Sequence, residues 1–94
     1  MEQIVHKLKT WPGYFWAIAA RAKTFELRMN DRTGGFKVGD HLLLQEYRPT
    51  RQEYTGSEIL VRVDYVCGFP FIANEDYIGM SISIIENEYT VQED

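Results

Sequence analysis

This chain has little of what disulfide-stabilised, metal-binding or membrane-spanning proteins are built from. Its one cysteine, Cys67, cannot form an internal disulfide, and with two histidines it makes no zinc-binding pattern. We therefore expect no metal and no other cofactor. The longest apolar stretch, from Tyr14 to Ala20, is far shorter than the ~20 residues of a membrane-spanning helix. No charged start followed by an apolar segment suggests a signal peptide, so we expect a cytoplasmic protein with no membrane contact.

The composition is that of an ordinary folded domain with an excess of acidic residues. The 94 residues, 45% hydrophobic and 26% charged, are enough for one core, and we expect a single domain over residues 1–94. Residues 1–40 hold seven Lys or Arg against four Asp or Glu, whereas residues 41–94 hold three against ten. The net charge of −4 argues against a broad DNA-binding surface. A local pocket for an anion in the basic first half stays compatible with this distribution.

Hydrophobic periodicity predicts five strands and one helix. We expect strands over residues 4–9, 24–30, 41–47, 57–66 and 77–86, a polar loop or hairpin connection over 48–55 and an acidic tail over about 87–94. The helix is expected from about residue 11 to residue 22, with Thr10 as its N-cap. Helical spacing predicts a buried stripe of Trp11, Tyr14, Phe15, Ile18 and Ala22. These elements favour a small mixed barrel, although the local pattern also allows an open α+β sheet.

The most informative segment runs from Lys23 to Arg32. It has the alternation of a half-buried strand, with apolar Phe25, Leu27 and Met29 between polar Thr24, Glu26, Arg28 and Asn30. Glu26 and Arg28 are two residues apart, so their side chains point the same way. A mobile ammonium, a planar guanidinium and a carboxylate acceptor suit a polar or anionic ligand. The alternative interpretation is a solvated sheet face whose ion pair contributes about 0–1 kcal/mol.

The same segment resembles the Gly-x-Lys-x-x-Glu-x-Arg signature of ASCH domains, which belong to the PUA-like superfamily of small β-barrels associated with RNA. Lys23, Glu26 and Arg28 match its charged positions, and Arg21 stands in place of the glycine. The flanking segments extend the similarity to a phage-associated ASCH-like family of unknown function; they are Leu8-Lys9, the predicted helix, Asn30-Asp31-Arg32 and Val38-Gly39-Asp40. The resemblance implies an α+β fold, a PUA-like mixed β-barrel of about five strands with one N-terminal helix between the first two.

The motif and the resemblance together predict a module that binds RNA or a nucleotide. The ligand is expected in a cleft between the helix and the motif strand, where splayed bases meet aromatic side chains and a few cations. The predicted ligand-binding residues are Lys9, Lys23, Glu26, Arg28, Asn30 and Arg32. On this interpretation, Glu26→Ala and Arg28→Ala leave folding intact and weaken binding.

Two other functions stay open. Some small ASCH-like proteins are amidohydrolases that deacetylate acetylated cytidine, which implies a hydrolase acting on a modified nucleoside. Its catalytic residues here would be Lys23, Glu26 and Thr24, the nearest hydroxyl. The acidic second half of the chain instead favours a phage or prophage module that binds a basic protein partner.

Overall fold

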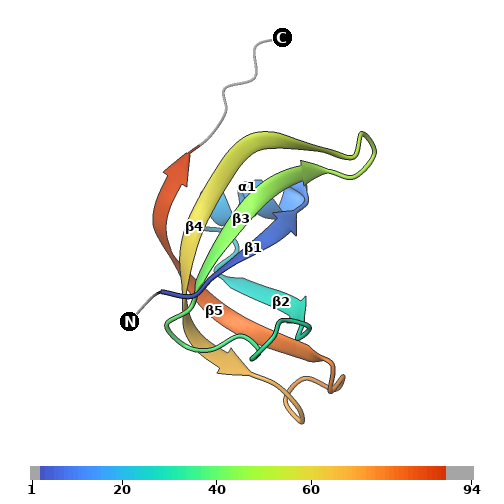
Figure 1. The fold of residues 1–94 in the computed structure, drawn as a ribbon, viewed down its shortest axis with the longest axis vertical. Helices are drawn as coiled ribbons and strands as arrows, with labels where there is room; N and C mark the ends of the chain where they lie inside the picture. The colour runs from blue at the N-terminus through green and yellow to red at the C-terminus, as the bar shows by residue number, and fades with distance from the viewer. Residues whose placement is uncertain (1–2, 89–94) are drawn as a thin grey trace.

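The computed structural model of the chain describes residues 3–88, which form five strands and one helix (Figure 1). The elements follow the order β1 (Val5–Thr10), α1 (Pro12–Ala19), β2 (Phe25–Met29), β3 (His41–Arg48), β4 (Glu53–Cys67) and β5 (Tyr77–Glu88). These strands join one sheet in the order β1-β3-β4-β5-β2. β1 pairs with β3 in parallel, and the other neighbouring strands pair antiparallel. The sheet is therefore mixed, with β1 and β2 at its edges.

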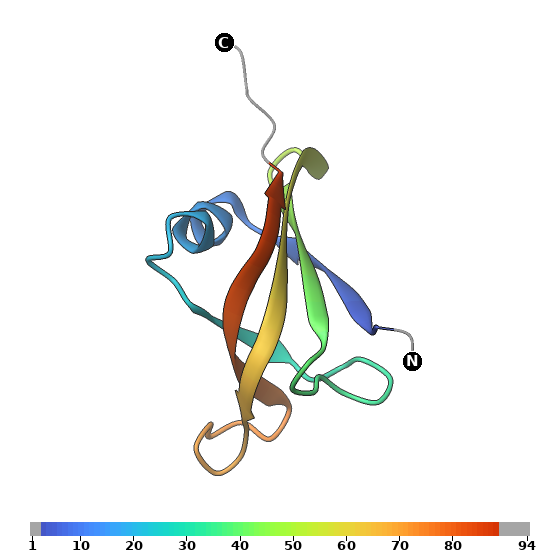
Figure 2. The ribbon, with the colours of Figure 1, turned by 90° about the vertical axis from the view of Figure 1, so that its left-hand side faces the viewer.

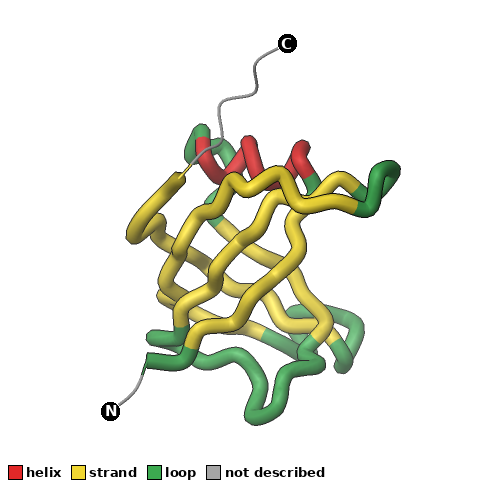
Figure 3. Tube along the Cα trace, turned by 45° about the horizontal axis from the view of Figure 1, so that its top comes forward, coloured by secondary structure: helices red, strands yellow, loops and turns green. Residues whose placement is uncertain are grey.

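The sheet curls into a half-barrel that is open between β1 and β2. The long strand β4 carries register shifts against β5 between Leu60 and Val61 and between Val63 and Tyr65. Such bulges bend a strand and increase its twist, which curls the sheet. α1 lies to one side of the sheet at the end where β1 finishes (Figure 2), and the longer loops lie at the opposite end (Figure 3). The prediction of a small, barrel-like mixed fold with a helix after the first strand is confirmed.

The core fills the space between the concave face of the sheet and α1. Alternate residues of β3 and β4 point inward, as expected from the period-two pattern of a strand. The buried apolar side chains are Leu8, Phe15, Ile18, Phe36, Leu42, Leu44, Ile59, Val61, Val63, Met80 and Ile82. Within residues 3–88, no helix has the length and apolar character needed to cross a membrane.

The start of α1 differs from the prediction. Thr10 is the last residue of β1 and pairs with Glu46 of β3, so it is not the N-cap. Its hydroxyl donates a hydrogen bond to the Leu8 carbonyl (3.3 Å). Trp11 takes the N-cap position without a side-chain hydrogen bond, and Pro12 begins the helix. The prediction of Thr10 as a cap was wrong because pairing with β3 holds this residue in the sheet.

Only the centre of the predicted helical stripe is buried. Phe15 and Ile18 are buried in the core, whereas Trp11, Tyr14 and Ala22 are exposed. α1 ends at Ala19, which places Ala22 beyond the helix. Trp11 and Tyr14 belong instead to the open side of the half-barrel.

The helix ends in a Schellman turn whose left-handed residue is Arg21. The Ala22 amide donates to the Ala17 carbonyl and the Arg21 amide donates to the Ile18 carbonyl, both at 2.9 Å. The φ angle of Arg21 is 61°. Glycine is the usual residue at this position because it has no Cβ to clash in the left-handed conformation. Arg21 therefore stands at a position where the backbone conformation favours glycine.

We expect Arg21→Gly to raise the free energy of unfolding by about 0.5–1 kcal/mol. A side chain in the left-handed conformation costs ~1–2 kcal/mol, and glycine gives back part of this through the greater entropy of the unfolded chain. Arg21→Ala is the matched control, because it removes the charge but keeps the Cβ. Urea denaturation measures both variants. An equal gain in the two would assign the effect to the side chain and not to the backbone.

Three of the strands, β3, β4 and β5, are longer than predicted. Tyr47 pairs with Tyr54 and Arg48 with Glu53, so the predicted loop or hairpin connection over 48–55 is a hairpin with its turn at 49–52. β5 continues to Glu88, which pairs with Glu58 of β4. The first residues of the predicted acidic tail are therefore strand, and the rest of that tail lies outside the described residues.

Candidate functional site

β2 turns its charged side chains into the half-barrel and its apolar side chains outward, the reverse of the usual arrangement. Glu26 is 3% exposed, whereas Phe25, Leu27 and Met29 are each about half exposed. The register with β5 explains this, because Glu26 lies opposite the buried Met80 and residues directly opposite each other share a face. A slip of one residue would reverse every side chain of β2.

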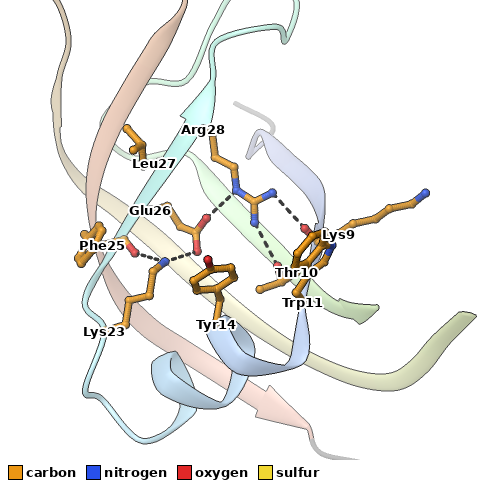
Figure 4. Close-up of a pocket in the computed structure, with 9 residues that line it drawn as sticks. All are labelled: Lys9, Thr10, Trp11, Tyr14, Lys23, Phe25, Glu26, Leu27 and Arg28. Atoms are coloured by element: carbon orange, nitrogen blue, oxygen red, sulfur yellow. Dashed lines mark hydrogen bonds and ion pairs between the residues drawn. The ribbon is translucent and has the colours of Figure 1, made fainter. Parts of the chain in front are cut away.

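Lys23, Glu26 and Arg28 form an ion triad in which Glu26 is the central and most buried member (Figure 4). Lys23 Nζ donates to Glu26 Oε1 at 3.0 Å, and Arg28 Nε donates to Glu26 Oε2 at 2.6 Å. The side chains of Lys23 and Arg28 are 17% and 24% exposed, against 3% for Glu26. The groups that a ligand reaches at this triad are therefore mainly cationic, and the triad carries a formal charge of +1.

Arg28 also connects the edges of β2 and β1 across the opening of the half-barrel. Its Nη1 donates to the Lys9 carbonyl (3.0 Å) and its Nη2 donates to Thr10 Oγ1 (3.2 Å). A guanidinium has five N–H groups, and these contacts with the bond to Glu26 engage three of them. Lys23 Nζ likewise donates to Glu26 and to the Phe25 carbonyl (2.7 Å). Both cations retain N–H groups that can bind an acceptor in the opening.

A cavity of about 520 Å³ lies at this opening, and we call it the seam cavity. It is lined by Lys9, Thr10, Trp11, Tyr14, Lys23, Phe25, Glu26, Leu27 and Arg28. The rings of Tyr14 and Phe25 lie near the ammonium of Lys23, with centroids 5.7 and 4.8 Å from Nζ. Aromatic side chains thus border a charged floor (Figure 4). The volume is in the range of small-molecule sites, about 300–1,000 Å³.

A family model described as "Domain of unknown function (DUF3850)" matches residues 5–82. The chain belongs to this family. The matched residues include every residue that lines the seam cavity of this DUF3850 domain. No curated protein matches the chain.

The DUF3850 domain brings together the predicted residues of the charged motif, Lys23, Glu26 and Arg28, in one cavity. Lys9 lines the same cavity, but its ammonium lies 4.5 Å from the centroid of the Tyr47 ring and points away from the triad (Figure 4). Lys9 therefore contributes its backbone carbonyl to the seam, where Arg28 binds it.

The remaining predicted residues lie outside the seam cavity of the DUF3850 domain. The backbone N–H of Asn30 donates to the Asp76 carbonyl (2.7 Å), and Arg32 Nη2 donates to the Lys7 carbonyl (2.9 Å). Both arginines thus bind backbone carbonyls at the edge of β1, Arg28 close to α1 and Arg32 two residues further from it. Thr24 is exposed and lines a smaller neighbouring cavity with Arg21. Asn30 and Arg32 therefore lie apart from the seam cavity, and their contact with a ligand stays a prediction.

Several residues of the seam cavity were not predicted as site residues: Thr10, Trp11, Tyr14, Phe25 and Leu27. The aromatic and aliphatic ones were assigned to the core because apolar periodicity shows which residues share a face and not which face is inward. One signal was available. When one face of a short strand carries both an acidic and a basic side chain, that face can be buried, because the two charges form an ion pair with each other.

The DUF3850 domain also holds an exposed counterpart of the Glu26–Arg28 pair. On β4, Arg62 Nε donates to Asp64 Oδ1 at 3.0 Å with the same spacing of two residues. A hydrogen bond from Ser83 and the nearby charge of Arg62 hold the pKa of Asp64 below its ordinary value. This pair is a matched control for the buried one. Among the described residues, no group of three or more His, Cys, Asp or Glu is placed to hold a metal ion.

Proposed function

We propose that the seam cavity binds a nucleotide or a short single-stranded RNA element. The observation that carries this proposal is one cavity with aromatic side chains at its border and a cationic floor. A base offers a flat π-face for stacking and carbonyl acceptors at its edge, and a phosphate offers anionic oxygens. The ligand thereby uses both kinds of surface at once.

The proposal assigns different tasks to the members of the triad. Lys23 and Arg28 donate to a carbonyl or phosphate oxygen of the ligand, because they are the accessible polar groups of the floor. Glu26 is a positioning residue: its two carboxylate oxygens hold the two cations in place. Trp11 and Tyr14, both more than half exposed, stack on the base.

The proposal includes a relationship to ASCH domains and a PUA-like barrel. This relationship is supported by the position of the three charged signature residues. They line one cavity together with residues of β1 and α1 that are distant from them in the sequence. The curled mixed sheet with a helix after its first strand also agrees with that architecture.

Titration with ribonucleoside 5′-monophosphates tests the proposal through tryptophan fluorescence. We expect saturable quenching. Tyr14→Ala should lower the affinity for the nucleotide by roughly 5- to 150-fold, which is the equivalent of the ~1–3 kcal/mol that one stacked base contributes. Trp11→Phe removes the signal, whereas Trp16→Phe keeps it because the Trp16 indole donates to Glu46 (2.7 Å) and not into the cavity. Arg62→Lys is the matched control for Arg28→Lys, and only the latter is expected to weaken binding.

The proposal would be contradicted if Tyr14→Ala and Arg28→Lys bound ribonucleoside 5′-monophosphates with unchanged affinity. The absence of any saturable fluorescence signal would contradict it as well. Incubation with acetylated cytidine then distinguishes binding from hydrolysis. Two residues with hydroxyls line the cavity, Thr10 and Tyr14. The contacts favour binding, because the aliphatic hydroxyl, that of Thr10, is buried and donates a hydrogen bond to the Leu8 carbonyl. Deacetylation above the level of a Lys23→Ala control would instead favour the hydrolase.

A protein-interaction module is the second candidate, and the outward face of β2 favours it. Phe25, Leu27 and Met29 are about half exposed there, and surface apolar clusters of this kind often mark contacts with other proteins. Met29 does not line the seam cavity, so Met29→Ser tests this face alone. Nuclease-resistant capture of one defined bacterial protein, lost in Met29→Ser, would support this candidate over RNA binding.

A further inference from the structure

A second surface with aromatic and cationic side chains lies directly outside the seam cavity. It covers the outer faces of β1 and of the β3–β4 hairpin, and we call it the hairpin surface. Its members are Lys7, Lys9, Tyr47, Arg51 and Tyr54; Arg48 and its partner Glu53 are on the opposite face of the hairpin, since each follows or precedes a tyrosine of this surface by one residue. The rings of Tyr47 and Tyr54 are paired across the hairpin with centroids 5.0 Å apart, and Lys9 Nζ lies 4.5 Å from the Tyr47 centroid.

The hairpin surface is positively charged although the chain as a whole is acidic. Three cations, Lys7, Lys9 and Arg51, lie there beside Glu58 and the Glu53 carboxylate that Arg51 contacts, which leaves a local balance of +1 in a chain of net charge −4. Glu53 is 3.4 Å from Arg48 and 3.7 Å from Arg51, and Glu58 accepts a hydrogen bond from Gln45. Arg51 is 71% exposed, so its guanidinium is free to move to an incoming phosphate.

The hairpin surface and the seam cavity meet at Lys9. The carbonyl of this residue accepts a hydrogen bond from Arg28 inside the cavity, while its ammonium lies over Tyr47 on the outer face. The two sites are therefore separated by the length of one lysine side chain. Trp11, two residues further along the chain, is part of the cavity border. A ligand that leaves the cavity past Lys9 and Trp11 reaches the tyrosine pair.

We infer that the ligand of the seam cavity is part of a single-stranded RNA whose neighbouring nucleotides bind the hairpin surface. This inference rests on the proposed function. Tyr54 is half exposed and offers a ring for a second base, and Lys9 is already held in place by the tyrosine ring. Lys9 and Arg51 bind the phosphates between the stacked bases. The exposed heads of this surface are charged and not aliphatic, which favours RNA over an apolar protein partner.

Fluorescence anisotropy with labelled single-stranded RNA, competed by unlabelled ribonucleoside monophosphates, tests the inference. We expect oligonucleotides of several residues to bind at least about tenfold more tightly than a monophosphate, since a second stacked base adds roughly 5- to 150-fold. Tyr54→Ala should abolish this gain without changing monophosphate affinity. Tyr65→Ala, an exposed tyrosine of the same strand outside the hairpin surface, is the matched control. Arg51→Ala should lower the salt dependence of RNA binding by about 0.7 in log–log slope.

The outcomes separate this inference from the proposed function. A length-dependent gain that Tyr54→Ala removes and Tyr65→Ala keeps supports the inference. Monophosphate binding that depends on Arg28, with no gain for longer RNA or a gain indifferent to Tyr54, overturns it and leaves the proposed function standing. If neither monophosphates nor RNA bind, the proposed function is wrong and the inference falls with it.

Discussion

Glu26→Ala is expected to lower the free energy of unfolding by about 2–4 kcal/mol. Removal of one partner from a buried ion pair costs ~3–5 kcal/mol because the remaining charge is left without compensation. Lys23 and Arg28 keep part of their hydration, which reduces that cost here. Urea denaturation of the variant measures the loss. This expectation replaces the one drawn from the sequence, in which Glu26→Ala left folding intact, because the carboxylate lies inside the half-barrel.

The control for Glu26→Ala is Asp64→Ala. Asp64 accepts a hydrogen bond from an arginine two residues away, as Glu26 does, but its pair is far more exposed. An exposed pair contributes about 0–1 kcal/mol, so this variant should lose little. Equal losses in Glu26→Ala and Asp64→Ala would contradict the buried position of the triad.

Phe15→Ala is expected to lower the free energy of unfolding by about 3–5 kcal/mol, the usual cost of truncating a fully buried aromatic side chain. Phe15 has no exposed surface and anchors α1 to the core with Ile18. Because α1 supplies Tyr14 to the seam cavity, loosening the helix should also weaken ligand binding. Thermal and urea unfolding measure the first effect, and monophosphate titration measures the second.

Tyr14→Ala is the matched variant in the same helix. Tyr14 is exposed, so the variant should lose less than about 1 kcal/mol of stability while its affinity for nucleotides falls. A large loss of stability in Tyr14→Ala, or a negligible one in Phe15→Ala, would contradict the assignment of Phe15 to the core and of Tyr14 to the cavity.

The strands that build most of the half-barrel could be predicted from the sequence. β3 and β4 alternate regularly, and their inward residues, such as Leu44 and Val61, are buried as the pattern requires. The charged motif could also be found, because Glu26 and Arg28 necessarily share a face. What the alternation leaves open is which face is inward. In β2 that choice depends on the register with β5, a long-range contact that no local pattern contains.

The other walls of the seam cavity depend on contacts that are distant in the sequence. Threonine is a residue type typical of helix N-caps, but the pairing of Thr10 with β3 keeps it in β1. Arg28 binds the backbone carbonyl of Lys9. Every residue has this group, so the amino-acid sequence gives no indication of the contact. Trp11 fits a buried helical stripe by spacing alone, and it is exposed because α1 begins only after it. The sequence therefore identified the charged floor of the seam cavity and Lys9, and missed the rest of its walls.

β2 turns its charged face inward, and we propose that this face forms a nucleotide-binding cavity with Trp11. The decisive measurement is side-chain NMR of the ¹⁵N-labelled protein during titration with ribonucleoside 5′-monophosphates. We predict progressive shifts of the Arg28 Nε–H and Trp11 Nε1–H signals, while the Arg62 Nε–H and Trp16 Nε1–H signals stay in place. Shifts confined to Arg62 or Trp16, or no shifts at any concentration, would contradict the claim.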